Sequence, residues 1–295
     1  MANLGEAIGV LIGVITIGSV YALSGVGFVV LFRSTSVLSF TQGEFMAAGA
    51  VVFYLGTATW HIGSLASAAT SLVVVAVSGW LVYRVLFRRL AGAEPFIVAV
   101  ATIALGTVLQ MIEYLIIGPD SLPMTTNFQN VVVARISGQG ILGADVTAVL
   151  AAVILVGALI LWLTRTGTGL KMRALGENAS LASYYGVDID RLSGVAWALG
   201  ALLAGAAGIA YALLTTVDVQ GIPNVGLVVF PGVLLGGLDS VAGALVGSYL
   251  IAGLEAVVSL TVGGTWENAV AYGVMLVVLL TRPSGFFGTK HVVRL

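Results

Sequence analysis

Uncharged apolar runs of membrane length are the feature that most constrains this chain. Residues 146–163 and 194–214 contain no charged side chain, and a transmembrane helix needs roughly 20 apolar residues. Of the 295 residues, 59% are hydrophobic and 8% are charged, whereas soluble domains carry about 25% charged residues. The sequence therefore predicts an all-α, polytopic transmembrane protein that crosses the inner or plasma membrane of the cell many times.

The apolar runs divide a single transmembrane domain, 1–295, into eight or nine expected spans. They lie near 7–32, 33–59, 62–82, 95–117, 146–163, 194–215 and 267–280, with two short spans in 225–260. Two regions should be broken or re-entrant, because polar residues interrupt them at 33–44 and at 235–240. Between the spans, the connection 118–145 contains a strand-like run at 131–136.

Glycine spacing predicts close contacts between some of these helices. Small-x-x-x-small pairs occur at Gly9/Gly13, Gly232/Gly236 and Gly243/Gly247. Lipid supplies no hydrophobic force between helices, so small residues that let two backbones touch are favoured at helix contacts. We expect these pairs to pack inside the chain rather than at a subunit interface.

The placement of Lys and Arg predicts the orientation, because cytoplasmic loops carry the excess of these residues. If the N-terminus lies outside and each span crosses once, eleven of the twelve basic residues lie inside and only Arg135 lies outside. The connection 118–145 is then external, and the C-terminus is cytoplasmic. The polar stretch 165–193, which we call the polar island, holds seven charged residues and is also cytoplasmic.

Motifs for catalysis, metal binding or nucleotide binding are missing from the sequence. There is no cysteine, and the segment 285–290 lacks the spacing of a phosphate-binding loop. The two histidines, His61 and His291, are far apart. We therefore expect no catalytic residue, no metal site and no cofactor bound by this chain, and a membrane-embedded enzyme is a weak alternative. The net charge of −1 argues against a nucleic-acid partner.

Three glutamates fall within apolar stretches, where ionisable residues are costly and usually face a cavity or a partner. Glu44 and Glu113 could line a solute path, or they could hydrogen-bond between helices. For Glu44 both interpretations stay open, whereas the structural one is favoured for Glu255. Interruptions in both halves of the chain, at 39–44 and 235–240, favour a central pathway.

Residues typical of helix ends limit the helix expected in the polar island to 177–186. Glu177 and Asn178 suit the start of a helix, and Gly186 suits a left-handed cap after its end. The predicted helix has only two to three turns, which is too short to be stable alone in water, so it needs a surface to dock on. Ala179 and Ala182 should share a face that a partner can approach closely. The alternative is an ordinary cytoplasmic connector.

Three ordered blocks of sequence resemble the permease subunits of ATP-binding-cassette importers of the branched-chain amino acid type (LivH-like). These blocks are 18–23 with 31–35 and 40–46, then 172–174 with 177–179 and 186–191, and finally 204–208 with 236–244. The chain departs from the family pattern at Ser39, where Asn is usual, and at Thr41, where Ala is common. The resemblance covers nearly the whole chain.

The resemblance implies a second related permease, two ATPase subunits that use ATP, and an extracytoplasmic solute-binding protein. The role of the ATPase-coupling helix then falls on Glu177, Asn178, Ala179, Ala182 and Gly186. Candidates for the translocation path are Ser39, Thr41, Gln42, Glu44 and Glu113. The external connection 118–145 is either a docking surface for the binding protein or a spacer.

The function implied is uptake of a small polar solute across the lipid bilayer. A branched-chain amino acid, urea, an amide or an aromatic acid would each fit this kind of permease, and the sequence does not choose among them. The rival hypothesis is a channel or secondary transporter that works alone, with Glu44 or Glu113 as an ion relay.

Overall fold

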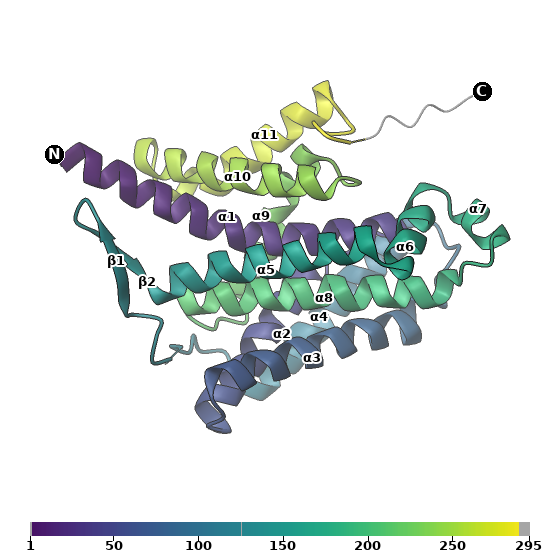
Figure 1. Cartoon of the computed structure of the whole chain (residues 1–295), viewed down its shortest axis with the longest axis horizontal. Helices are drawn as coiled ribbons and strands as arrows, with labels where there is room; N and C mark the ends of the chain where they lie inside the picture. The colour runs from purple at the N-terminus through teal and green to yellow at the C-terminus, as the bar shows by residue number, and fades with distance from the viewer. Residues whose placement is uncertain (1, 125, 289–295) are drawn as a thin grey trace.

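The computed structural model describes residues 2–124 and 126–288 and is mostly helical (Figure 1). Its α-helices are α1 (Ala2–Thr35), α2 (Gln42–Tyr54), α3 (Ser64–Val82), α4 (Pro95–Ile117), α5 (Gly143–Arg165), α6 (Gly167–Glu177), α7 (Ala179–Tyr184), α8 (Ile189–Leu214), α9 (Gly221–Gly236), α10 (Val241–Thr261) and α11 (Glu267–Thr281). The π-helical turns η1 (Leu55–Thr59) and η2 (Tyr83–Phe87) extend α2 and α3, and the 3-10 turn η3 (Gly264–Trp266) precedes α11. The strands β1 (Val132–Ile136) and β2 (Gln139–Leu142) form an antiparallel hairpin in the predicted connection.

Seven helices in the described part of the chain are long and apolar enough to cross a membrane. They are α1, α3 with η2, α4, α5, α8, α10, and α11 with η3. The shorter α2 and α9 have 13 and 16 residues, and α2 lies in the first region predicted to be broken. The interruption predicted at 235–240 is misplaced, because these residues form the turn between α9 and α10, and the break lies before α9. The polytopic helical class is therefore confirmed, whereas helix length alone supports seven spans and not the expected eight or nine.

The helices run side by side between two ends of the molecule (Figure 1). At the hairpin end, the start of α1 meets the hairpin, since a Cβ added to Gly5 would lie 3.1 Å from the Ser137 carbonyl oxygen. At the island end, α1 finishes against α6, and a Cβ added to Gly176 would lie 3.0 Å from the Arg33 carbonyl oxygen. An isolated β-bridge between Leu122 and Val217 places the end of α8 at the hairpin end, so α1 and α8 run in opposite directions.

The helices α1–α4 and the helices α8–α11 have the same arrangement, but the chain runs through the two groups in opposite directions. In each group a long helix is followed by a non-helical break, a short helix and two further apolar helices. The helices α1 and α8 pack on each other, and α3 packs on α8 as α10 packs on α1. This is an inverted repeat of the kind found in many transporters, and it places the short helices α2 and α9 in contact at the centre.

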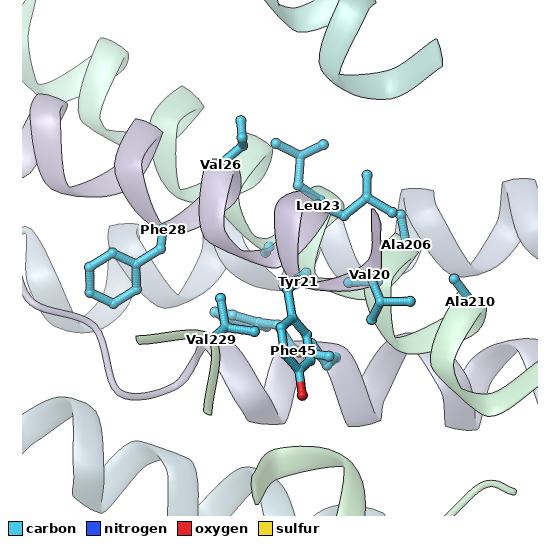
Figure 2. Packing of buried hydrophobic residues seen from close by; sticks show 14 of the residues in the cluster. Val20, Tyr21, Leu23, Val26, Phe28, Phe45, Ala206, Ala210 and Val229 are labelled. Atoms are coloured by element: carbon cyan, nitrogen blue, oxygen red, sulfur yellow. The ribbon is translucent and has the colours of Figure 1, made fainter. Parts of the chain in front are cut away.

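Small and apolar side chains fill the centre of this repeat (Figure 2). Val20, Leu23 and Val26 of α1 are fully buried. In the same cluster are Phe45 of α2, Ala206 and Ala210 of α8, and Val229 of α9. Small side chains at a helix contact allow the two backbones to approach closely.

The predicted glycine contacts are confirmed where they join α9 to α10. A Cβ added to Gly236 would lie 2.0 Å from the Gly243 carbonyl oxygen, and one on Gly247 would lie 2.0 Å from the Gly232 carbonyl oxygen. The pair in α1 behaves differently, because Gly9 faces the Gln139 side chain of the hairpin and Gly13 has no neighbour within 4 Å. Two of the three pairs therefore serve helix packing inside the chain.

Candidate transport path and coupling segment

The break between α1 and α2, residues 36–41, is held in the interior by side-chain hydrogen bonds. The hydroxyls of Ser39 and Thr41 lie 2.7 Å apart and are hydrogen-bonded, and both side chains are buried. Gln42 Nε2 donates to the carbonyl oxygens of Ser24 at 3.4 Å and Gly200 at 3.0 Å. These bonds attach the start of α2 to α1 and α8, which places Ser39, Thr41 and Gln42 together at the centre of the molecule.

The starts of α2 and α9 touch backbone to backbone. A Cβ added to Gly43 would lie 2.4 Å from the Pro223 carbonyl oxygen, and one added to Gly226 would lie 2.3 Å from the Gly43 Cα. Each helix is preceded by a non-helical break, so the amino ends of both short helices lie inside the molecule. Helix amino ends carry partial positive charge and free N–H groups, and such an interior arrangement is found at solute sites of transporters.

Glu44 and Glu113 lie between α2 and α4. A Cβ added to Gly106 of α4 would lie 3.5 Å from Glu44 Cγ, and Glu113 follows two turns later on the same buried face of α4. Glu44 Oε2 and both carboxylate oxygens of Glu113 are buried without a hydrogen-bond partner among the described residues. Gln110 Nε2 donates to the Val219 carbonyl oxygen at 3.3 Å, which joins α4 to the break before α9.

Buried carboxylates without partners are costly in a membrane protein and usually face a path or a cavity. The described Lys and Arg residues lie at the two ends of the molecule, so they leave Glu44 and Glu113 without a basic partner. Glu255 differs in one of its oxygens, because the Tyr21 hydroxyl donates to Oε2 at 2.8 Å across the contact between α1 and α10, while Oε1 is buried without a partner among the described residues. The structure thus gives Glu255 an interhelical bond and leaves the carboxylates of Glu44 and Glu113 without a side-chain partner among the described residues.

The short helix in the polar island forms where the sequence predicted it. Asn178 Oδ1 accepts a hydrogen bond from the Leu181 backbone N–H at 2.9 Å, and Gly186 has a φ of +73°. The predicted roles of Asn178 and Gly186 at the helix ends are confirmed, whereas Glu177, expected at the start of this helix, is the last residue of α6. The helix α7 covers Ala179–Tyr184, which is shorter than the two to three turns expected.

The exposed face of α7 differs from the expected one. Ala182 is only 5% exposed, and its carbonyl oxygen accepts a hydrogen bond from Val187 N–H, so it packs within its own chain. Ala179 is exposed, and the two alanines do not share an open face. Tyr184 and Tyr185 are instead 86% and 87% exposed. Sequence reasoning missed these tyrosines because it searched for small residues at helical spacing.

Side chains attach the far side of the polar island to α3. Asp190, in the first turn of α8, accepts a hydrogen bond from the Tyr83 hydroxyl at 3.0 Å and pairs with Arg88 Nε at 3.1 Å. Asp188 caps α8 by accepting from the Arg191 backbone N–H at 3.0 Å. These contacts connect the island to the end of α3 and the start of α8.

A cavity of about 700 Å³ opens at the island end. Its walls come from the end of α1 and the following break, the turn before α4, the segment joining α6 to α7, and the start of α8. Arg33, Ser36 and Leu38 line one side, and Glu177 and Ala179 line another. The cavity therefore separates the island from the break that leads to Ser39.

Long apolar helices around two interior breaks, with a polar segment exposed at one end, define a multi-pass membrane transport protein. The chain belongs to the family described as branched-chain amino acid transport system, permease component, whose sequence model matches residues 10–279. It is therefore a transport permease subunit and not an enzyme.

Named relatives cover nearly the whole chain. The high-affinity branched-chain amino acid transport system permease protein BraD of Pseudomonas aeruginosa is 26% identical over 96% of both chains. The corresponding LivH protein of Escherichia coli K12 is 24% identical over 94% of both. A probable LivH protein of Methanocaldococcus jannaschii is 28% identical over 98% of this chain and 94% of its own. No solved structure gives a significant match.

Proposed function

We propose that this chain is one of two permease subunits of an ATP-binding-cassette importer in the inner or plasma membrane. Two partner ATPase subunits bind and hydrolyse ATP, and an extracytoplasmic binding protein delivers the solute. The family match over residues 10–279 carries this proposal. Because the relatives are named for branched-chain amino acids, that solute class comes first, ahead of urea, amides and aromatic acids.

Successive segments of the chain finish alternately at the island end and at the hairpin end, which supports nine crossings with the N-terminus outside. The helices α2 and α9 are too short to cross the membrane alone. The non-helical residues before them, 36–41 and 215–220, supply the rest of each crossing. Nine of the ten described Lys and Arg residues lie at the island end, and Arg135 lies in the hairpin. An excess of basic residues marks the cytoplasmic side, so the island end faces the cytoplasm and the hairpin faces the binding protein.

In this arrangement the solute passes the two breaks at the centre of the inverted repeat. Ser39, Thr41 and Gln42 shape the path, and the carboxyl groups of Glu44 and Glu113 contact the solute or the water that accompanies it. The unpartnered carboxylate oxygens beside α4 support this placement.

Coupling to ATP hydrolysis takes place through α7. Asn178 and Gly186 give the helix its ends, Glu177 closes α6 just before it, and Ala179 and Ala182 allow close packing on either side of it. The exposed rings of Tyr184 and Tyr185 supply the contact area, because aromatic side chains dominate the energy of many interfaces. Movement of α7 then reaches α3 through the bonds of Asp190.

Reconstitution tests the proposal. The permease should be co-expressed with an ATPase pair, a second permease and a solute-binding protein from the same genome, and placed in liposomes. Uptake of leucine, isoleucine or valine should require ATP inside, on the ATPase side, and the binding protein outside. Uptake by the permease alone in an ion gradient would instead support a secondary transporter or channel.

A further inference from the structure

Arg33 and Arg173 differ from the other basic residues of the described chain. Of its ten Lys and Arg residues, eight are exposed, and these two alone are half-buried. The Nε atom of Arg173 is fully buried and has no hydrogen-bond partner there. Removing a cation from water is costly unless an anion or acceptor replaces the lost hydration.

The described residues provide no such replacement. Other arginines have partners, since Arg88 pairs with Asp190 and Arg84 lies over the Trp80 ring. No described carboxylate lies within ion-pair distance of Arg33 or Arg173, and no described group accepts a hydrogen bond from either side chain. The donors of both guanidinium groups are therefore available to water or to a group from outside the described chain, and the buried Nε of Arg173 has lost its water.

Both arginines line the same small cavity of about 20 Å³. The residues around it are Val30, Arg33, Ser34, Leu163, Met172, Arg173 and Val241, and none of them is acidic. A volume of this size holds about one water molecule, or a single oxygen atom of a larger anion. Two cations and a serine hydroxyl around it would attract an anionic oxygen, since guanidinium groups match carboxylate and phosphate geometry.

The position of the cavity decides which anion is favoured. Val30 is close to the end of α1, Leu163 is close to the end of α5, and Val241 begins α10. These three helices have membrane length, so the cavity lies where hydrocarbon meets water at the island end. Basic pockets between transmembrane helices at this level bind lipid headgroups.

We propose that Arg33 and Arg173 bind the phosphate of an anionic phospholipid headgroup at the island-end surface of the membrane. Arg173 belongs to α6 and Arg33 to α1, so the bound headgroup bridges the first helix of the polar island to the transmembrane bundle (Figure 1). The lipid then fixes α6, and through it α7, against the helices that carry the solute path. This site is additional to the proposed transport function and does not depend on the identity of the solute.

Lipid retention and melting temperature test the site. The purified permease complex is placed in nanodiscs of phosphatidylcholine alone or with one third phosphatidylglycerol. Native mass spectrometry should show preferential retention of phosphatidylglycerol, and the melting temperature should rise when it is present. In Arg33→Gln/Arg173→Gln this retention should fall about tenfold, because charge-assisted hydrogen bonds to the phosphate are lost.

The matched control is Arg165→Gln/Lys171→Gln, which removes the same charge from exposed positions at the same end. It should keep most of the retention; an equal loss would mean general surface attraction and would overturn the site. Arg33→Lys/Arg173→Lys preserves the charge and should keep part of the retention, which separates lost binding from lost folding.

Two further results would contradict the proposal. If inorganic phosphate raises the melting temperature in phosphatidylcholine nanodiscs as much as phosphatidylglycerol does, the ligand is a soluble anion. If the permease without ATPase subunits retains phosphatidylglycerol and the complex with them does not, the arginines pair with an acidic group of the ATPase instead.

Discussion

The interior around the two breaks and the polar island are held together in different ways. In the interior, backbones touch where glycine removes the side chain, as between Gly49 of α2 and Gly205 of α8. In the island, α7 has two caps and one buried alanine, while its aromatic side chains face outward. Substitutions in the interior should therefore reduce the amount of folded protein, whereas substitutions on α7 should change partner binding.

The largest effect is expected at Gly208 of α8. A Cβ there would lie 1.8 Å from the Met46 carbonyl oxygen, which cannot move without displacing α2. Gly208→Ala should destabilise the protein by about 3 kcal/mol or more through overpacking. The matched control is Gly157→Ala in α5, which has no neighbour within 4 Å and should leave stability unchanged or slightly improved. Size-exclusion profiles and melting temperatures measure both; equal stability of the two variants would contradict the close α2–α8 contact.

The next effect concerns the exposed tyrosines of α7. Tyr184→Ala/Tyr185→Ala should weaken ATPase association by roughly 2 kcal/mol or more, about thirtyfold, because large aromatic anchors are lost. The melting temperature of the permease alone should not change. Ser183→Ala, on the same exposed helix, is the control. Full ATPase association and uptake in the tyrosine variant would show that the rings are not the docking surface.

Ala182 is less suited than the tyrosines to a test of the docking surface. Because Ala182 is buried within its own chain, Ala182→Arg should disturb the fold of the island as well as any docking. Its effect cannot distinguish the two causes, so the tyrosines provide the sharper test.

A smaller effect is expected from the membrane glutamates, and it should differ in kind between them. Glu44→Gln and Glu113→Gln should each reduce uptake, by about tenfold, while assembly with the ATPase persists. Glu255→Gln weakens the hydrogen bond from Tyr21, so it should lower stability by about 1 kcal/mol with little specific effect on transport. Normal uptake by Glu44→Gln and Glu113→Gln would assign both residues a structural role.

The smallest effect is expected for the pair between Arg88 and Asp190. The side chains are 50% and 37% exposed, and exposed ion pairs contribute about 0–1 kcal/mol. Arg88→Gln should therefore shift the melting temperature very little. A double-mutant cycle with Asp190→Asn measures the coupling energy, and a value well above 1 kcal/mol would mean that the island is held more firmly than its exposure suggests.

Much of the architecture follows from local patterns. The apolar runs predict the long helices, and the polar residues after Arg33 predict the break before α2. Asn178 and Gly186 predict the limits of α7, because capping depends on residues adjacent in sequence. The residues 215–220 were expected only as a connection between spans, and the interruption was predicted at 235–240, which forms the turn between α9 and α10.

The sequence by itself determined that the chain is a helical membrane protein, where its long helices lie and where α7, one of the two short helices of the island, begins and ends. Only the tertiary structure decided that the two halves form an inverted repeat, that Ala182 is covered, and that Arg33 shares a cavity with Arg173. The physical reason is the range of the interactions. Hydropathy and capping act within a few turns, whereas these contacts join residues that are distant in sequence, and their partners become known only when the helices are packed.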